Sequence, residues 1–164
     1  MIEADRIKIQ AISLQDIARF SEYRDKEEVA MYQSWDEYPL NKAINRIEYC
    51  QKHPFHGQIG NYQFGLYLKE NNQLIGDIFI EIDGHTTFTL GYTLDSVYWS
   101  KGYASEALKS VFKAMNETYS FKICLCHVYE DNIKSIKLLE RNGFDKIHKS
   151  WFYQDVLYRK MLNK

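Results

Sequence analysis

Apolar and polar residues alternate along three consecutive segments in the middle of the chain. Residues 62–68, 74–82 and 86–94 follow the two-residue period of a β-strand that buries one of its faces. The segments between them, residues 70–73 and 83–85, are short and contain Asn, Asp and Gly, which favour turns. This pattern predicts an antiparallel meander of three strands joined by two tight turns.

Other segments carry apolar residues at the spacing of an amphipathic helix. Ser13 precedes the first of these segments and Asn41 the third, and both residue types cap helix N-termini. Residues 31–40 are aromatic and acidic and include Pro39, so this stretch is predicted to be a loop. The last segment ends at Gly143, a residue type suited to the position after a helix. The helices and helical turns predicted in this way cover residues 14–23, 27–31, 41–50, 105–115 and 132–142.

Further strand patterns lie towards the two ends of the chain. Residues 6–9 alternate and are expected to form the first strand, whereas residues 122–128 are a short apolar run typical of a buried parallel strand. The helix before this run implies a right-handed crossover from the third meander strand. Residues 144–148 and 153–161 are expected to close the sheet, with a turn near Trp151. The predicted fold class is therefore α/β (α+β), with a mixed, mostly antiparallel central sheet of about seven strands and helices on both faces.

Length and composition limit the class of protein. The chain has 164 residues, which suits a single domain over residues 1–164. A formal net charge of -1 and a sequence pI near 6.5 argue against a dedicated nucleic-acid-binding protein. The charged N-terminal sequence MIEADRIKIQ differs from a signal peptide, and no apolar run has the length of a membrane span. The odd number of cysteines, three, favours a reduced, cytoplasmic protein over a disulfide-linked one.

The segment after the third predicted strand has the character of an anion site. Residues 100–104 read Ser-Lys-Gly-Tyr-Ala and lead into a predicted helix. The first N–H groups of a helix have no partner within the helix, and the helix dipole favours negative charge beside them. A phosphate group is therefore a candidate ligand here, and an ordinary loop that leads into a helix is the alternative interpretation.

Two motifs of this chain resemble those of one protein family. The sequence WSKGYA is similar to the R/Q-x-x-G-x-G/A segment of the GNAT (general-control-type N-acetyltransferase) superfamily. The sequence VYEDNIKSIKLLERNGF resembles the second acyl-CoA-contacting segment of that family, and MYQSWDEY resembles the acceptor-side segment of its ribosomal-protein-alanine acetyltransferase branch. The resemblance implies the GNAT acyl-CoA N-acyltransferase fold. It also implies an enzyme that transfers an acetyl group from acetyl-CoA to a primary amine by direct attack in a ternary complex.

The resemblance implies a role for each matched position. In the family, the loop before this helix holds the CoA pyrophosphate with backbone amides, and Gly102 and Ala104 leave room for that approach. A strand matched by residues 91–94 binds pantetheine through backbone groups that its parallel neighbour leaves unpaired. Asn132 matches a cofactor-contacting asparagine, although it suits a helix N-cap equally well, and Trp99 replaces the usual Arg or Gln. The implied cofactor-binding residues are Tyr92, Leu94, Ser100, Lys101, Gly102, Tyr103, Ala104, Ser105, Asn132 and Ser135.

The catalytic residues implied by the resemblance are fewer. Ser135, one turn into its helix, is a candidate donor to the CoA sulfur, and a small residue that permits close approach is the alternative. Many relatives carry a tyrosine as general acid where this chain has Leu139, so either Ser135 or water would supply that proton, or acid catalysis is weak. Glu81, Asp36 and Glu37 are candidate bases for the amine, and each also suits a solvated surface carboxylate.

Aromatic residues are the candidate acceptor-binding groups. Tyr32, Trp35 and Tyr38 would stack on a cationic amine, or else they pack a long loop onto the sheet. The acceptor is expected to be a protein N-terminus or a small-molecule amine. We expect a monomer or a homodimer without nucleic-acid or membrane partners. A non-catalytic acyl-CoA-binding sensor or interaction module is the alternative function, motivated by the leucine at position 139.

One short motif raises the question of a metal site. Residues 124–127 read Cys-Leu-Cys-His. On a strand, Cys124 and Cys126 share one face and His127 points to the other, and no second pair has the spacing of a zinc finger. We therefore expect no metal, and cysteines that pack in the core.

Overall fold

One eight-stranded sheet runs through the part of the chain that the computed structural model describes, residues 1–149 and 155–162. The strands lie in the order β1-β2-β3-β4-β5-β6-β8-β7, and all neighbours are antiparallel except β5 and β6. The strands are β1 (Ile2–Glu3), β2 (Ile7–Gln10), β3 (Gly60–Leu68), β4 (Leu74–Ile82), β5 (Thr87–Leu94), β6 (Ile123–Tyr129), β7 (Asp145–Lys149) and β8 (Asp155–Met161).

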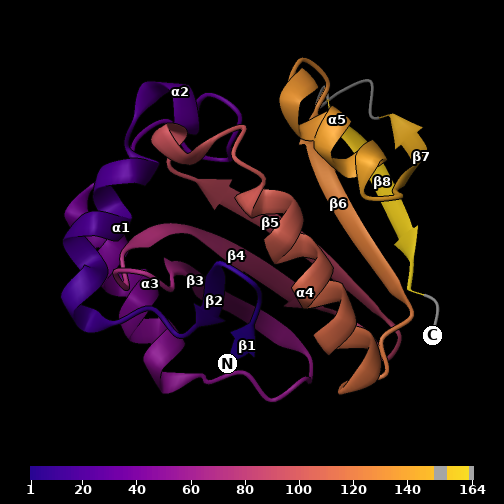
Figure 1. Ribbon diagram of the computed structural model, residues 1–164, viewed down its shortest axis with the longest axis horizontal. Helices are drawn as coiled ribbons and strands as arrows, with labels where there is room; N and C mark the ends of the chain where they lie inside the picture. The colour runs from indigo at the N-terminus through magenta and orange to yellow at the C-terminus, as the bar shows by residue number, and fades with distance from the viewer. Residues whose placement is uncertain (150–154, 163–164) are drawn as a thin grey trace.

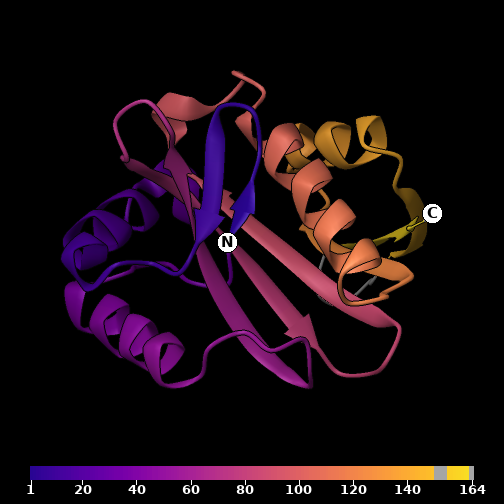
Figure 2. The same ribbon diagram turned by 60° about the horizontal axis from the view of Figure 1, so that its bottom comes forward.

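Helices cover both faces of this sheet (Figures 1 and 2). On one face, Phe20 of α1 and Ile47 of α3 pack with Tyr67 of β3. On the other face, Leu108 of α4 packs with Ile78 of β4, and α5 adds its own apolar stripe to the same core. Burying one such aliphatic side chain contributes about 2 kcal/mol, so each amphipathic helix is held by its apolar stripe. The helices are α1 (Ile17–Arg24), α2 (Glu27–Ala30), α3 (Leu40–Lys52), α4 (Tyr103–Glu117) and α5 (Ile133–Arg141).

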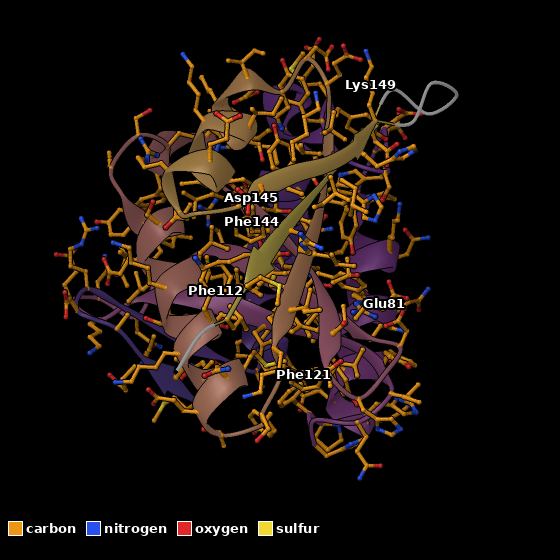
Figure 3. The ribbon with its side chains drawn as sticks, turned by 90° about the vertical axis from the view of Figure 1, so that its right-hand side faces the viewer. Glu81, Phe112, Phe121, Phe144, Asp145 and Lys149 are labelled. Carbon is orange, nitrogen blue, oxygen red and sulfur yellow. The ribbon has the colours of Figure 1, made fainter. Side chains whose placement is uncertain are left out.

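Aromatic packing joins α4 to the C-terminal part of the sheet. The rings of Phe112 on α4 and Phe144, which directly precedes β7, lie with their centroids 5.6 Å apart (Figure 3). Both side chains are buried in the core on the α4 face. This contact helps to hold the second half of the sheet, β6 to β8, against the crossover helix.

The parallel strands β5 and β6 pair over a short length only. Their register runs from Thr87 opposite Ile123 to Thr89 opposite Leu125. Beyond these residues the two strands separate, as the upper part of Figure 1 shows. β5 stays paired with β4 as far as Leu94, and β6 stays paired with β8 throughout. The separation therefore leaves backbone groups of both strands without a strand partner on the edges that face each other.

The predicted fold class is confirmed, with two differences in detail. The sheet has eight strands among the described residues, because Ile2–Glu3 forms a short strand paired with β2 that was too short to show a period. Asn41 was predicted to cap the third helix, but α3 begins at Leu40 with Pro39 as its N-cap. Pro39 has φ -66°, which suits a helix entry, and Asn41 Oδ1 accepts instead from Lys42 N. The predicted turn at Trp151 lies outside the described residues.

A buried carboxylate fastens the end of β5 to the first helical segment. Asp95 directly follows β5 and is 1% exposed. Its side chain accepts hydrogen bonds from Arg19 of α1 and from Lys26, whose Nζ lies 2.6 Å from Asp95 Oδ1. Burial opposes ionisation of this carboxyl, but the hydrogen bonds from Lys26 and Arg19 prevail and lower the pKa of Asp95 below its ordinary value.

We expect Asp95→Asn to lower the free energy of unfolding by about 2 kcal/mol at pH 7, because two charge-assisted hydrogen bonds are lost. The folded-state pKa of Asp95 lies below its unfolded value. The charged form therefore stabilises the fold above about pH 4, and this contribution is lost as the pH falls through the folded pKa. Urea unfolding at pH 7 and pH 3 measures the effect, with Asp83→Asn in the exposed turn after β4 as the control. Equal stability of wild type and Asp95→Asn at pH 7 would contradict the assignment.

Candidate functional site

A cavity of about 1370 Å³ opens where β5 and β6 separate. Residues 90–94 of β5 and 126–129 of β6 form its two sides, and the loop before α4 and much of α5 form one end. Glu28 and Val29 of α2, with residues 31–34 after it, line the other part of the wall. The cavity is therefore open to both helical layers of the molecule.

The start of α4 presents unpaired backbone donors to this cavity. Gly102 is the N-cap and has φ +87°, and Ser100 has φ +60°, so the loop uses left-handed backbone twice within three residues. Among the described residues, the N–H groups of Tyr103, Ala104 and Ser105 donate no hydrogen bond. Free N–H groups at a helix N-terminus, beside a turn of this kind, form a concave site for an anion.

The loop is fixed from behind by the N-terminal hairpin. Glu106 Oε1 accepts from Arg6 N at 2.6 Å, and Glu106 Oε2 accepts from Arg6 Nε at 2.8 Å. Arg6 Nη1 also donates to the carbonyl of Lys101, and its guanidinium lies over the ring of Tyr103. At the front, Asn142 Nδ2 donates to Ser105 Oγ at 2.9 Å. These contacts hold the first turn of α4 in place before any ligand binds.

The backbone of β5 is turned so that alternate residues face the gap. Asp95 N donates to Ile75 O beside β4, so odd-numbered residues of this strand direct their N–H and C=O groups to β4. The backbone groups of Tyr92 and Leu94 then face β6 across the gap. The carbonyl of Leu94 is already occupied, because Trp99 Nε1 donates to it at 2.8 Å. Trp99 thus satisfies one carbonyl on the β5 edge that faces the gap. Tyr92 keeps both its N–H and its C=O free on that edge.

A pair of hydroxyl groups crosses the gap on the α4 and α5 side. Tyr92 Oη and Ser135 Oγ lie 2.5 Å apart. Burial raises the pKa of the Tyr92 phenol well above its ordinary value, so the phenol stays protonated at neutral pH. Asn132 caps α5, since its Oδ1 accepts from Ser135 N at 3.1 Å. Leu139, which also lines the cavity, brings no polar atom to this place.

Three basic residues of α5 line the same cavity. Lys134, Lys137 and Arg141 follow one another at intervals of three and four residues, so they share one side of the helix. Lys134 Nζ lies 4.8 Å from the ring centroid of Trp99. Sequence reasoning missed these cations, although their helical spacing after Asn132 was a usable signal. Together with the N-terminus of α4 they make this end of the cavity favourable for negative charge.

Most of the residues singled out in the sequence lie on the cavity wall, and some do not. Lys101 does not line the described wall, and its Nζ lies 5.4 Å from the ring centroid of Tyr98. Glu81 is exposed on β4, at the right-hand side of the view in Figure 3. Asp36 and Glu37 are exposed and do not line the described cavity wall. Those that line it are Tyr32, Tyr92, Leu94, Ser100, Gly102, Tyr103, Ala104, Ser105, Asn132 and Ser135.

The remaining two aromatic candidates pack inside the protein. Tyr38 is 4% exposed and lies against Phe20, and Arg24 stacks on its ring. Trp35 Nε1 donates to the carbonyl of Arg24 at 3.0 Å, and the Arg24 guanidinium lies 3.8 Å from the Trp35 ring centroid. These contacts fit the alternative role of Trp35 and Tyr38, in which they pack the loop onto the rest of the protein. Tyr32 is the member of the set that reaches the cavity.

Neither a metal-binding cluster nor a membrane-spanning helix is present among the described residues. Within residues 1–149 and 155–162, no group of three or more His, Cys, Asp or Glu side chains is arranged to hold a metal ion. Cys124 and Cys126 are buried on one face of β6, as expected for core residues. None of the helices in the same ranges has the length and apolar character needed to cross a membrane.

Comparison with known proteins identifies similar sequences. Residues 6–145 match the model of a family described as "Acetyltransferase (GNAT) domain". The uncharacterized N-acetyltransferase p20 of Bacillus licheniformis is 26% identical over 145 residues, which cover 87% of this chain and 80% of the relative. The uncharacterized N-acetyltransferase YoaA of Bacillus subtilis is 23% identical over 160 residues, covering 94% of this chain and 89% of the relative.

Solved structures share the fold. A GNAT-family acetyltransferase from Bacillus anthracis superposes with a TM-score of 0.85 at 20% identity, covering 98% of this chain and 97% of that one. RimL, described as a ribosomal L7/L12 alpha-N-protein acetyltransferase in complex with coenzyme A, gives a TM-score of 0.84 at 15% identity, with 98% and 97% covered. RimJ of Mycobacterium smegmatis, in complex with CoA-disulfide, gives 0.80 at 16% identity, with 94% and 81% covered.

Proposed function

The chain belongs to the GNAT acetyltransferase family, and we propose that it is a single-domain enzyme that transfers an acetyl group from acetyl-CoA to a primary amine. The observation that carries the proposal is the cavity between β5 and β6, with free backbone donors at one end and an unpaired strand edge along one side. Acetyl-CoA is a long, anionic molecule with amide groups in its middle. The two features match its phosphates and its amides, respectively.

The residues of the α4 loop would hold the pyrophosphate. The N–H groups of residues 103–105 are free, and the loop from Ser100 to Ser105 is fixed from behind by Arg6. The left-handed conformation of Ser100 carries a strain of about 1 kcal/mol, which is typical of ligand-binding loops. Lys101 would contribute through its backbone N–H, because its carbonyl is engaged by Arg6. Lys137 and Arg141 would add charge for the phosphates, and Asn132 would contact the cofactor while it caps α5.

The edge of β5 would bind the pantetheine amides in place of a strand. Tyr92 has both backbone groups directed into the gap, and Leu94 has its N–H there. Hydrogen bonds made in this way satisfy backbone groups that β6 leaves unpaired. The thioester end would then lie deeper in the gap, towards the last paired residues, Thr89 and Leu125.

Ser135 would donate a hydrogen bond to the sulfur as the C–S bond breaks. The Tyr92 phenol is the stronger donor of the pair, so it occupies a lone pair of Ser135 Oγ and leaves the serine hydrogen free for another acceptor. This arrangement would take the place of the tyrosine that Leu139 replaces. A thiol has a pKa near about 8.5, so its thiolate needs only modest help to leave.

The acceptor in this proposal is a protein N-terminus or a small-molecule amine. The name of RimL supports the first, since that protein is described as an alpha-N-protein acetyltransferase. Tyr32 on the cavity wall supports an approach of the amine past α2. A non-catalytic acyl-CoA-binding module is the second candidate. Leu139 has no ionisable group that could protonate the sulfur, and Glu81 is exposed and does not line the cavity.

Calorimetric titration with acetyl-CoA tests the pyrophosphate loop. Gly102→Trp is expected to weaken binding by at least about tenfold, since the left-handed backbone disfavours a side chain and its Cβ would lie 3.2 Å from Arg6 Nη2, where the indole would displace the contact that fixes the loop. Gly84→Trp, in the open turn after β4, is the matched control and should bind as wild type. Circular dichroism establishes that both variants fold. Unchanged affinity of a folded Gly102→Trp protein would reject the loop, and a wild type without affinity would reject the proposed function.

The cations of α5 give a second test on the same titration. The double variant Lys137→Glu and Arg141→Glu is expected to weaken acetyl-CoA binding by about tenfold or more at low salt, because attraction for the phosphates becomes repulsion. The deficit should shrink as ionic strength rises towards 1 M. Lys146→Glu on β7, outside the cavity wall, should leave affinity unchanged. A double variant with wild-type affinity would exclude these side chains from the phosphate site.

Turnover separates the enzyme from the binding module. Thiol release from acetyl-CoA is measured with a panel of amines: peptides with N-terminal serine or alanine, spermidine and kanamycin. Ser135→Ala is expected to lower kcat by about 10- to 100-fold while acetyl-CoA affinity stays within about twofold, because the hydroxyl acts on the leaving sulfur. Tyr92→Phe should show a smaller loss of kcat. Cofactor binding by the wild type with no amine-dependent thiol release would favour the module, and an unchanged kcat in Ser135→Ala would remove the serine from the chemistry.

A further inference from the structure

A histidine and an aspartate lie on the cavity wall away from Tyr92 and Ser135. His127 of β6 and Asp155 of β8 both line the cavity, and His127 Nδ1 is 3.0 Å from Asp155 Oδ2. Their side chains are 56% and 26% exposed, so the pair is open to a ligand. His127 lies opposite Leu157 and Asp155 lies opposite Tyr129, which makes the pair diagonal neighbours on one face of the sheet.

The pair faces the side of the sheet that α1 and α3 occupy. Cys126 and Val128 point into the core beneath α4 and α5, so His127 between them points to the opposite face. Tyr92 and Ser135 meet on the α4 and α5 side. The cavity thus has a hydroxyl pair on one side of the sheet and a histidine on the other. A ligand that ran between β5 and β6 would have one group on each side.

The position of His127 along β6 is close to the place where the thioester of bound acetyl-CoA would lie, near the last paired residues of β5 and β6. Leu125 is the last residue of β6 that pairs with β5, and His127 is the next residue with its side chain on the same face. Continuing the register would place Gly91 opposite His127. Gly91 has no side chain to fill the space, and it lines the cavity as well. A strand-like ligand in the gap would run about 4.8 Å from β6, within reach of an imidazole.

We propose that His127, oriented by Asp155, is the base that takes the proton from the amine substrate. This inference rests on the proposed acetyltransferase function. The hydrogen bond to the Asp155 carboxylate makes Nδ1 the protonated nitrogen, so Nε2 carries the lone pair and is the acceptor. Among the carboxylates, Glu81, Asp36 and Glu37 do not line the described wall. Glu28 and Asp131 do line it, but Glu28 Oε1 already accepts from Ser96 Oγ at 2.7 Å, and Asp131 lies beside the N-cap of α5, beyond the end of β6.

The protons and electrons of the step balance. An alkylammonium gives one proton to Nε2 of His127, and the freed nitrogen lone pair forms the new C–N bond with the acetyl carbon. The C–S bond breaks, and its electron pair leaves with the sulfur. A second proton from the nitrogen is lost as the amide forms, while the sulfur gains one through Ser135 or water. The imidazolium then releases its proton to solvent, so that one proton is liberated for each acetyl group transferred.

Other titratable and charged groups surround His127. Its own face of the sheet carries Tyr129 on β6 and Asp155 and Arg159 on β8. The same cavity wall also carries Glu28 and Tyr32 on the α2 side, and Asp131, Lys134, Lys137 and Arg141 at the α5 end. Asp145 and His148 lie one strand further away on β7, opposite Arg159 and Leu157. Asp155 is the group in direct contact with the imidazole.

The test measures acetyl transfer from acetyl-CoA by the full chain at pH 7. The acceptor is the amine of the panel that the wild type acetylates fastest. His127→Ala is expected to lower kcat by about 100-fold with unchanged affinity for acetyl-CoA, and the deficit should narrow as the pH rises above the pKa of the amine. Imidazole added at millimolar concentration should restore part of the rate to His127→Ala, because the free base can enter the open site. Asp155→Asn is expected to lower kcat by about tenfold with KM unchanged, as befits a positioning residue.

His148→Ala is the matched control, since it removes an exposed histidine from the same sheet face outside the cavity wall. It should keep wild-type kcat and show no response to imidazole. If His127→Ala keeps kcat within about twofold at all pH values, or loses activity that imidazole does not restore while its fold and affinity are intact, the role of His127 is overturned. Absence of transfer by the wild type to every amine of the panel would instead overturn the proposed function, and this inference with it.

Discussion

The separation of β5 from β6 is the constraint on which the rest of this protein depends. The two strands pair from Thr87–Ile123 to Thr89–Leu125 and then part, while each keeps its full ladder with its outer neighbour. Backbone groups that face a gap must find partners in water, in side chains or in a ligand. Here Trp99 provides one partner, for the Leu94 carbonyl, and leaves the others for a bound chain. A continuous sheet at this place would satisfy the same groups and leave no room for substrate.

The gap also divides the chemistry between two faces. Because side chains alternate along a strand, neighbouring residues of β5 and β6 point to opposite layers. Tyr92 reaches Ser135 beneath α5, whereas His127 reaches Asp155 on the other face. In the proposed reaction, the leaving sulfur and the arriving amine belong on different sides of one carbonyl carbon. A split sheet supplies such an arrangement without any insertion or second domain.

Much of the architecture follows from local patterns in the chain. The alternating runs predicted the meander, and the helical stripes predicted α1 to α5 to within a few residues, because burial of one face imposes its own period. The errors are local as well: Pro39 rather than Asn41 begins α3, and Ile2–Glu3 is too short to carry a period. Of the aromatic residues after α2, Tyr38 lies in the core, and its burial depends on Phe20 and Arg24 in another helix.

The sequence by itself determined the order of strands and helices, the glycine-containing entry to α4 and the family resemblance. These are properties of residues close together in the chain, where capping, turn chemistry and periodicity act. Only the tertiary structure decided which side chains meet. Tyr92 and Ser135 are 43 residues apart, and His127 and Asp155 are 28 apart. Their contacts depend on strand register and on how far β5 and β6 diverge. Those quantities are set by packing across the whole sheet, and no local pattern encodes them.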